Sequence, residues 1–282
     1  MKLILITLLL SRSIFAQASA DDRRANTPIE PFRMIGNIYY VGAAEVTSFL
    51  VTTPDGHILV DGGYAETGAQ IKANVVKLGF KVEDIKYLLN TQSHFDHAGS
   101  LAELKKLTGA KMVASAADKV GLENGGKGDF IWGDTLPYSP VTVDRVVKDG
   151  DKVSLGGVTL KAVLIPGHTK GSTAWTYQLK DSGKTLNVIF FGSTSAPGYK
   201  FIGNTMYPNI VTDFESTFTA AKKMKVDVFF ASHGSAFDLL GKSEKLKNDP
   251  NPFIDPRSYT DYLAETEKAF REKLAAQKNA PQ

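Results

Sequence analysis

Strand-like and helix-like segments alternate along this sequence, and this alternation constrains the fold more than any other feature. Helical spacing of apolar residues predicts helices over Thr67–Leu78 and Leu101–Leu107, which end near Gly79 and Gly109. Runs of β-branched and aromatic residues predict strands at 37–41, 47–52, 57–60, 85–89 and 111–114. Such alternation is typical of α/β proteins, in which helices cover a sheet.

The second half of the chain repeats this pattern. Strands are predicted at 158–165, 173–178, 186–191 and 228–231, and helices at 213–224 and 259–278. We find no linker rich in Pro, Gly or Ser, no low-complexity tract and no short repeat. Residues 21–282 are therefore predicted to form one domain.

The first twenty residues have the pattern of a secretory signal peptide. Lys2 precedes the apolar run Leu3–Leu10, and small residues follow up to Ala18 and Ala20, after either of which cleavage is expected. The apolar run is shorter than the roughly 20 residues of a membrane-spanning helix. We expect export to the periplasm and no membrane association; the alternative is a buried N-terminal helix.

The composition narrows the classes of partner and ligand. Lys and Arg number 33 against 30 Asp and Glu, a net charge of +3, and they form no basic stripe that would favour nucleic acid. The chain has no cysteine, so it has no disulfides and any metal must be held by His, Asp, Glu or amide groups. We expect a monomer that acts on a small molecule.

Four of the five histidines follow predicted strands. His94 and His97 come after strand 85–89, His168 after strand 158–165, and His233 after strand 228–231. Strand ends of α/β sheets hold ligand-contacting side chains, and imidazole is the commonest zinc ligand. His57 lies beside a turn and is expected at the surface.

The segment from Thr91 to His97 is the densest part of this group. Alternate residues of an extended loop point the same way, so its side chains can converge. We predict one zinc site from Gln92, His94 and His168, and a second from Asp96, His97 and His233. One or two Zn²⁺ ions are expected per chain, with two favoured. Two alternatives are core histidines without a ligand and a zinc carrier without enzyme activity, but a carrier would need a His- or acid-rich loop that is not found.

The motifs resemble the metallo-β-lactamase superfamily, whose cluster reads His-x-His-x-Asp-His. Glutamine at position 92 is similar to the GOB-like branch of the subclass B3 metallo-β-lactamases. Further likeness to subclass B3 lies in Pro31–Arg33, Leu59–Gly63, Pro166–Ser172, Ser195–Tyr199, Ser232–Gly234 and Phe237–Leu239.

The resemblance implies a fold and an activity. The implied fold is an α/β, four-layer αβ/βα sandwich. The implied reaction is zinc-dependent hydrolysis of penicillins, cephalosporins and carbapenems by a metal-bound hydroxide, with Asp96 as the catalytic residue that orients the water; such activity confers antibiotic resistance. Ser193 and Ser195 would bind the substrate carboxylate near the second metal; the alternative is that they only cap or shape their loop. Asp61 would shape the base of the site.

Two features remain open at this point. The Gly-rich segment 121–133, with Phe130 and Trp132, is read either as a flap over the cleft or as a plain surface loop. The alternative activity is that of another exported hydrolase of this superfamily, a lactonase or a thioesterase. Glyoxalase and lactonase relatives carry an aspartate where this chain has Ser193, which favours the β-lactamase reading.

Overall fold

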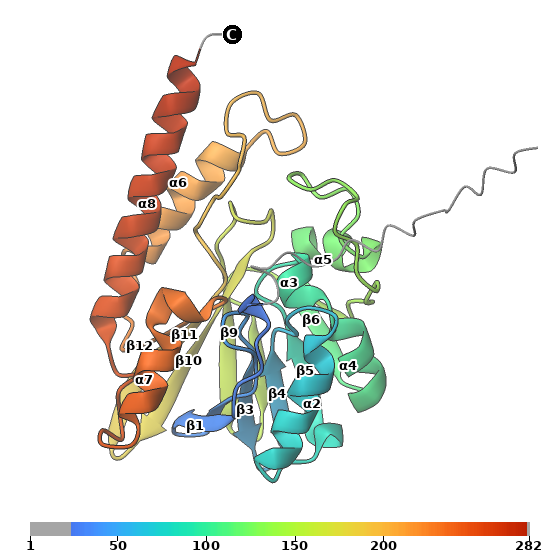
Figure 1. Ribbon diagram of the computed structural model, residues 1–282, viewed down its shortest axis with the longest axis vertical. Helices are drawn as coiled ribbons and strands as arrows, with labels where there is room; N and C mark the ends of the chain where they lie inside the picture. Colours follow the sequence, from blue (N-terminus) through green and yellow to red (C-terminus); the bar gives the residue numbers. More distant parts are fainter. Residues whose placement is uncertain (1–23, 281–282) are drawn as a thin grey trace, which may run out of the picture.

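We describe the protein from a computed structural model that places residues 24–280. The predicted signal peptide, residues 1–20, lies outside the described residues. Helices occupy two opposite sides of the molecule and the strands lie between them (Figure 1). The α/β character expected from the sequence is therefore confirmed.

The strands form two sheets. In the first sheet the order is β1-β2-β3-β4-β5-β6-β7, and in the second it is β12-β11-β10-β9-β8. The first sheet comprises β1 (Phe32–Ile35), β2 (Ile38–Tyr40), β3 (Phe49–Thr53), β4 (Gly56–Val60), β5 (Ile85–Leu89), β6 (Lys111–Ser115) and β7 (Arg145–Val147). The second comprises β8 (Lys152–Leu155), β9 (Val158–Leu164), β10 (Thr173–Asp181), β11 (Lys184–Phe191) and β12 (Val228–Ala231).

The helices are divided between the two sheets. The helices are α2 (Thr67–Lys77), α3 (Phe95–Ala98), α4 (Leu101–Thr108), α5 (Ala116–Asn124), α6 (Ile210–Ala221), α7 (Leu239–Lys245) and α8 (Pro256–Asn279), with 3₁₀ turns η1 (Val82–Asp84) and η2 (Gly234–Phe237). In Figure 1, α2, α4 and α5 lie beside the first sheet, and α6 and α8 beside the second. The order of layers is thus helix, sheet, sheet, helix.

Alternation along the strands explains why the layers hold together. Phe49 and Val51 of β3 belong to the main apolar cluster, whereas Leu50 between them belongs to the cluster under α2 and α4. Successive side chains of a strand point to opposite faces, so β3 is buried on both. Burial of apolar area at about 25 cal/mol per Å² is the main stabilising contribution of such a core.

The second sheet uses the same device. The Phe230 ring lies 5.2 Å from that of Phe49 across the two sheets, and the neighbouring Phe229 ring lies 5.3 Å from Tyr259 of α8. Strand β12 therefore packs against the opposite sheet with one face and against its own helix layer with the other.

Parallel pairing gathers several strand ends at one edge. Strands β4, β5 and β6 are parallel to one another, and β11 is parallel to β12. The two sheets are joined at this edge, where Thr47 N donates to Ser232 O (3.1 Å) and Gly234 N to Glu45 O (2.7 Å). The carboxyl ends of β5 and β12 consequently face a shared space.

Several element predictions need correction. The predicted helix at 213–224 spans Ile210–Ala221, and the last helix starts at Pro256, where the Asp255 side chain accepts a hydrogen bond from Ser258 N. Elements β1, β7, β8, α5 and α7 were not predicted. Most are short, and periodicity carries little signal over three to five residues.

The expected surface position of His57 is wrong. This residue is buried, 7% exposed, in β4 of the first sheet, and its ring lies edge-on to Phe80 with centroids 5.0 Å apart. The preceding turn suggested exposure, but the partner strands β3 and β5 cover the residue on both sides.

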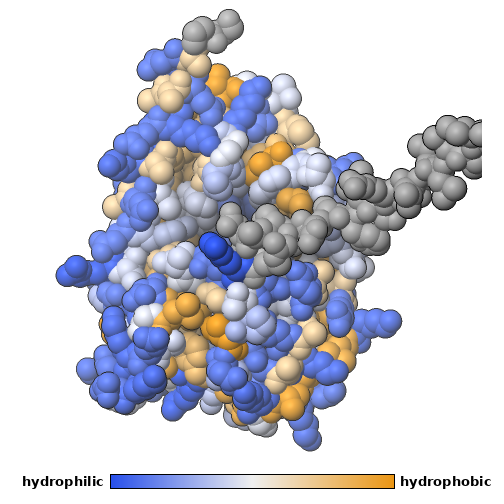
Figure 2. Space-filling model, viewed as in Figure 1, coloured by the Kyte–Doolittle hydropathy of each residue, from blue (hydrophilic) through white to orange (hydrophobic). Residues whose placement is uncertain are grey.

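Hydrophilic side chains cover most of the face that Figure 2 shows, and hydrophobic residues form small separate patches among them. Among residues 24–280, no helix is both long enough and apolar enough to cross a membrane.

Candidate metal centre

Six side chains predicted as metal ligands meet at the shared edge of the two sheets. Gln92 and His94 follow β5, Asp96 and His97 lie on α3, His168 follows β9, and His233 follows β12. The expectation of one extended loop is wrong for half of the segment. The backbone at His94 is extended (φ −69°, ψ 153°), but Phe95–Ala98 is helical. The change of backbone separates the ligands into two groups.

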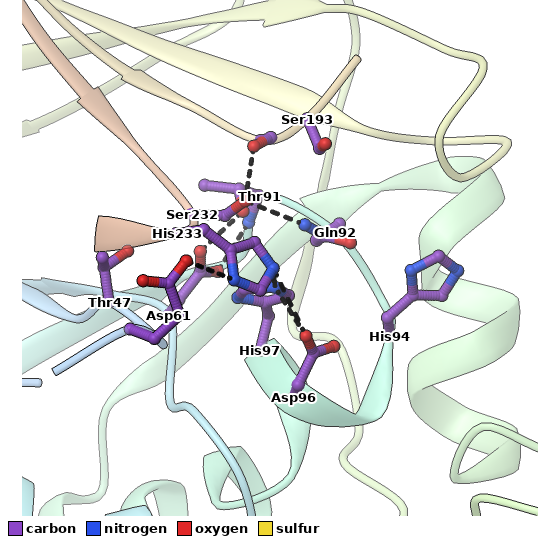
Figure 3. A network of polar contacts seen from close by, with 12 residues as sticks. Thr47, Asp61, Thr91, Gln92, His94, Asp96, His97, Ser193, Ser232 and His233 are labelled. Atoms are coloured by element: carbon purple, nitrogen blue, oxygen red, sulfur yellow. Dashed lines mark hydrogen bonds and ion pairs between the residues drawn. The ribbon is translucent and has the colours of Figure 1, made fainter. Parts of the chain in front are cut away.

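The second group has the geometry of a metal site. His97 Nε2 lies 3.3 Å from His233 Nε2, and Asp96 Oδ2 lies 3.2 Å from the former and 3.5 Å from the latter. In Figure 3 the three side chains converge from α3 and from the end of β12. Ligand atoms this close suit a single cation in the space between them.

The first group brings together Gln92, His94 and His168. His94 Nδ1 lies 3.2 Å from His168 Nε2. Both side chains are buried, and their rings are nearly perpendicular, with centroids 4.8 Å apart. Two ring nitrogens that face each other at this distance need either a shared proton or a cation.

Gln92, the third predicted ligand of the first group, has a buried side-chain oxygen. Its Nε2 donates to Ser232 Oγ (3.1 Å), whereas its Oε1 is buried without a hydrogen-bond partner among the described residues. Figure 3 shows the nitrogen of Gln92 turned toward Ser232 and the oxygen turned away. A buried oxygen without a partner is costly unless a ligand binds it. The residues present therefore fit a metal ion at this site.

The outward ring nitrogens of three histidines face oxygen atoms. His168 Nδ1 donates to Ser195 O (2.8 Å), His233 Nδ1 lies 3.5 Å from Glu45 Oε1, and His94 Nε2 lies 3.5 Å from Asp129 Oδ2. Partners of this kind fix the tautomer and the orientation of metal-binding imidazoles. None of these partners was singled out for this role from the sequence.

Asp61 lies beneath the ligands in a strained conformation. Its φ is 61°, in the left-handed region that residues other than glycine rarely adopt. The carboxylate accepts from Thr91 N (2.8 Å), Thr91 Oγ1 (2.6 Å) and Asn90 Nδ2 (3.1 Å). Burial raises the pKa of Asp61 to about 6, against the opposing effects of His97 and of these hydrogen bonds. Asp61 thus anchors the start of the ligand segment, as expected.

Asp118 of α5 joins the two loops of the first group. It accepts from Ser93 N (3.0 Å), Thr169 Oγ1 (2.8 Å) and Gly171 N (3.0 Å). Gly171 is required at this contact, because a Cβ there would lie 2.1 Å from Ser115 Oγ. Burial raises the pKa of Asp118 to about 6, although hydrogen bonds from Thr169 and Gly171 oppose the change.

The charge states of Asp96 and His168 suit metal binding, whereas the pKa of His233 is raised, because Glu45 and Asp96 outweigh the effect of burial. Burial alone would raise the pKa of Asp96, but His97 and His233 hold this pKa far below its usual range. Burial and the neighbouring His94 lower the pKa of His168 well below its ordinary value. An ionised carboxylate and a neutral imidazole are the forms that bind cations.

Ser193 and Ser195 lie together after β11. Their hydroxyl oxygens are 2.9 Å apart, and Ser195 N donates to Ser193 Oγ (3.0 Å). Tyr262 of α8 supports this segment, because Thr194 N donates to its hydroxyl oxygen (3.1 Å). The two side chains are thus placed next to the loop that supports His168.

Residues 125–135, which we call the covering loop, pack against the first group. The Trp132 ring lies edge-on to His94 (4.7 Å) and to Phe95 (5.5 Å). The predicted Gly-rich segment began at residue 121, but its first four residues belong to α5. Contact with His94 shows that this segment is more than a plain surface loop.

Glu45, Asp118 and Asp129 are site residues that sequence reasoning missed. They lie in segments far from the ligands in sequence and follow no motif. Only the placement of loops and α5 in space reveals them. The Gly-rich composition around Asp129 was the one available signal.

Comparison with known proteins agrees with this geometry. A family model described as the metallo-beta-lactamase superfamily matches residues 41–233, which include all six candidate ligand residues. A metallo-beta-lactamase structure from Cronobacter sakazakii is 39% identical with a TM-score of 0.89, covering 93% of this chain and 100% of that one.

Two further solved structures are similar over most of their length. A subclass B3 metallo-beta-lactamase of Bradyrhizobium japonicum is 40% identical (TM-score 0.86; 91% of this chain and 97% of that one). The native enzyme from Legionella gormanii is 39% identical (TM-score 0.88; 90% of this chain and 99% of that one). The two-sheet sandwich expected from the resemblance is therefore confirmed.

Curated relatives carry a different name. A hydroxyacylglutathione hydrolase of Hyphomonas neptunium is 31% identical over 118 residues, which span 42% of this chain and only 38% of that protein. One from Haemophilus influenzae is 24% identical over 191 residues, 78% of its length. These matches cover the chain less completely than the solved structures do.

Proposed function

Because the chain belongs to the metallo-beta-lactamase superfamily, we propose that it is a zinc-dependent enzyme that hydrolyses the amide bond of β-lactam antibiotics. The observation that carries this proposal is the likeness to subclass B3 metallo-beta-lactamases over 90% or more of both chains. Penicillins, cephalosporins and carbapenems are the proposed substrates, and resistance to them the consequence. The glutamine at position 92 supports placement in the GOB-like branch.

The residues that would hold metal are those of the two groups. Gln92 Oε1, His94 Nδ1 and His168 Nε2 would bind one zinc ion, and Asp96, His97 and His233 a second. Zinc supplies a Lewis acid, which polarises a carbonyl and lowers the pKa of a bound water molecule to about 7. This chemistry removes the need for a side-chain nucleophile.

Asp96 is the proposed catalytic residue. Its carboxylate stays ionised, because the facing histidines hold its pKa low. It can therefore accept a hydrogen bond from the attacking water and orient it toward the lactam carbonyl. After the ring opens, the departing nitrogen takes up the proton that the attacking water gives up, delivered by a water molecule or by Asp96.

Ser193 and Ser195 are proposed to bind the substrate carboxylate. Their adjacent hydroxyls offer two donors at one spot, and Tyr262 holds the segment in place. Two neighbouring hydroxyl donors suit the two oxygens of a carboxylate. This arrangement would align the lactam with the metal centre.

We also propose export to the periplasm, which the first twenty residues support and where such an enzyme meets its substrates. Detection of the full-length protein's mature form in a periplasmic fraction would support this proposal. Retention of the uncleaved chain inside the cell would contradict it.

The alternative function is that of a thioesterase or lactonase of the same superfamily. The curated hydroxyacylglutathione hydrolases favour it. The residue after Gly192 opposes it, because Ser193 offers no carboxylate that could bridge two metals.

Hydrolysis of one penicillin, one cephalosporin and one carbapenem by purified zinc-loaded protein tests the proposal. We expect turnover of β-lactams that a chelator abolishes and that added zinc restores. Turnover that survives complete zinc removal, or the absence of turnover with both sites loaded, would contradict it.

A further inference from the structure

The covering loop places one carboxylate against the first group of ligands. Asp129 Oδ2 lies 3.5 Å from His94 Nε2, and the two side chains are 17% and 2% exposed. Within residues 24–280, no other carboxylate lies within ion-pair distance of His94 or His168. Through this contact, an irregular loop meets a buried histidine of the first group.

The two carboxylate oxygens of Asp129 contact different groups. Oδ1 accepts from Ile131 N (2.7 Å) and Trp132 N (3.0 Å), which closes the turn of the loop. Oδ2 is left to face His94. The backbone also closes on itself here, because Gly133 N donates to Asp129 O (2.9 Å). A folded turn therefore holds the carboxylate in position.

The position of Asp129 decides which nitrogen of His94 can bind a metal. A carboxylate accepts and cannot donate, so it favours a proton on the Nε2 atom that it faces. His94 Nδ1 is then unprotonated, and this is the atom that faces His168 Nε2 at 3.2 Å. At 3.5 Å the Asp129 carboxylate meets His94 Nε2 at ion-pair distance and not in a hydrogen bond, and its negative charge favours the tautomer that the first site requires.

The first site has particular need of such support. Its ligands are an amide and two imidazoles, and none of them is anionic. The second site contains Asp96. A carboxylate behind His94 offsets part of the charge of a bound cation.

The packing of the covering loop couples it to this contact. Trp132, next to the Asp129 turn, lies edge-on to His94 at 4.7 Å. The cavity left among Ser93, His94, Asp129 and Trp132 is about 10 Å³, which is near the lower limit for one water molecule. Movement of the loop would therefore disturb His94, and movement of His94 would disturb the loop.

We propose that Asp129 is a positioning residue that orients His94 for the first metal and thereby couples the covering loop to occupancy of that site. The inference rests on the metal centre of the proposed function but on no particular substrate. Its test measures metal binding and ring protonation, so it can fail while β-lactam hydrolysis stands.

Asp129→Asn separates the two contacts of the carboxylate. The amide keeps an oxygen for the turn but presents an NH₂ donor to His94 Nε2, which favours the tautomer with a proton on Nδ1. We expect competition with a chromophoric chelator to show first-site zinc affinity weakened by about 10- to 100-fold, while second-site affinity stays unchanged. Asp134→Asn is the matched control, because Asp134 lies in the same loop and accepts from Gly128 N instead.

Two further measurements report the mechanism directly. Nitrogen-15 chemical shifts of the metal-free protein should show His94 protonated on Nε2 in the wild type and on Nδ1 in Asp129→Asn; with five histidines the signals can be assigned individually. Zinc titration should change the fluorescence of Trp132 in the wild type, and Trp132→Phe should remove that change, because the only other tryptophan, Trp175, is fully buried in the core.

Three results would overturn the proposal. They are first-site affinity within twofold of wild type in Asp129→Asn, an unchanged His94 tautomer, or an equal loss of affinity in Asp134→Asn, which would assign the effect to loop folding alone.

Discussion

The ligand residues of the two proposed zinc sites differ, and so should the zinc affinities of these sites. The second site combines an ionised carboxylate with two imidazoles, whereas the first combines two imidazoles with the neutral oxygen of Gln92. Neutral amide oxygen suits harder cations than zinc, for which imidazole is a better ligand. The two sites should therefore fill in order, the second before the first.

Gln92→His should tighten the first site. The imidazole replaces the weakest ligand of the group, so we expect zinc affinity to rise by about tenfold, or about 1.4 kcal/mol. Chelator competition measures this, with the second site as internal reference. Equal affinity in the two proteins would show that Gln92 is not a ligand. The Gln92 Nε2 contact with Ser232 is lost in this variant, so the free energy of unfolding should be measured alongside.

Asp96→Asn should abolish most hydrolysis. The amide removes the negative charge between His97 and His233 and can no longer take a proton, so we expect kcat to fall by at least about 100-fold and one zinc ion to be lost. Steady-state kinetics and metal analysis measure the two effects. Asp261→Asn on the exposed side of α8 is the control. Hydrolysis at the wild-type rate in Asp96→Asn would refute the assignment.

At the scale of elements, helix α5 connects the two loops that carry His94 and His168. Asp118 reaches the segment before His94 and the loop after His168 at once. A raised pKa in the folded state means that protonation of Asp118 stabilises the fold. That stability is complete below the ordinary pKa of 3.8 and is lost as the pH rises through about 6.

Asp118→Asn tests this linkage in metal-free protein. Asparagine does not titrate, so only the wild type loses stability from this group as the pH rises. The difference in unfolding free energy between wild type and Asp118→Asn should therefore become smaller by up to about 3 kcal/mol between pH 4 and pH 7. Urea denaturation at several pH values measures it. For Asp144→Asn the difference should instead grow as the pH rises, because Lys105 and Met112 N outweigh burial and lower the pKa of Asp144. A loss in Asp118→Asn that is constant or grows with pH would contradict the account.

Elements also show what sequence reasoning can and cannot supply. The ligands were predictable, because His94, His168 and His233 each follow a strand that apolar patterning reveals. The turn from extended Gln92 to helical Asp96 was not, because four residues are too few for a helical period. Asp118 and Asp129 were also beyond reach, since their roles depend on where α5 and the covering loop fold back in space.

Over the whole molecule, the fold follows from strands that are apolar on both faces. Phe49 and Leu50 are adjacent in sequence yet belong to different apolar clusters, which requires a second sheet on one side and helices on the other. Such local patterns made the α/β layering predictable. The division of the strands into sheets of seven and five was not, because pairing partners are far apart in the chain.

The two classes of relatives suggest two different substrates for this protein. Solved β-lactamases match more than 90% of the chain, while the two curated hydroxyacylglutathione hydrolases described above match 42% and 62% of it. One fold can support several reactions, so the fold alone does not choose between these two activities. The choice depends on the residues around the metals, above all Ser193 and Ser195.

The most direct measurement is kcat/KM for a carbapenem and for a hydroxyacylglutathione thioester, made on one preparation of the zinc-loaded protein. The account predicts β-lactam turnover at least about 100-fold more efficient than thioester turnover, a difference of about 2.7 kcal/mol in transition-state stabilisation. Both activities should be lost together when zinc is removed. Thioester hydrolysis with no turnover of any β-lactam would contradict the proposed function while leaving the metal centre intact.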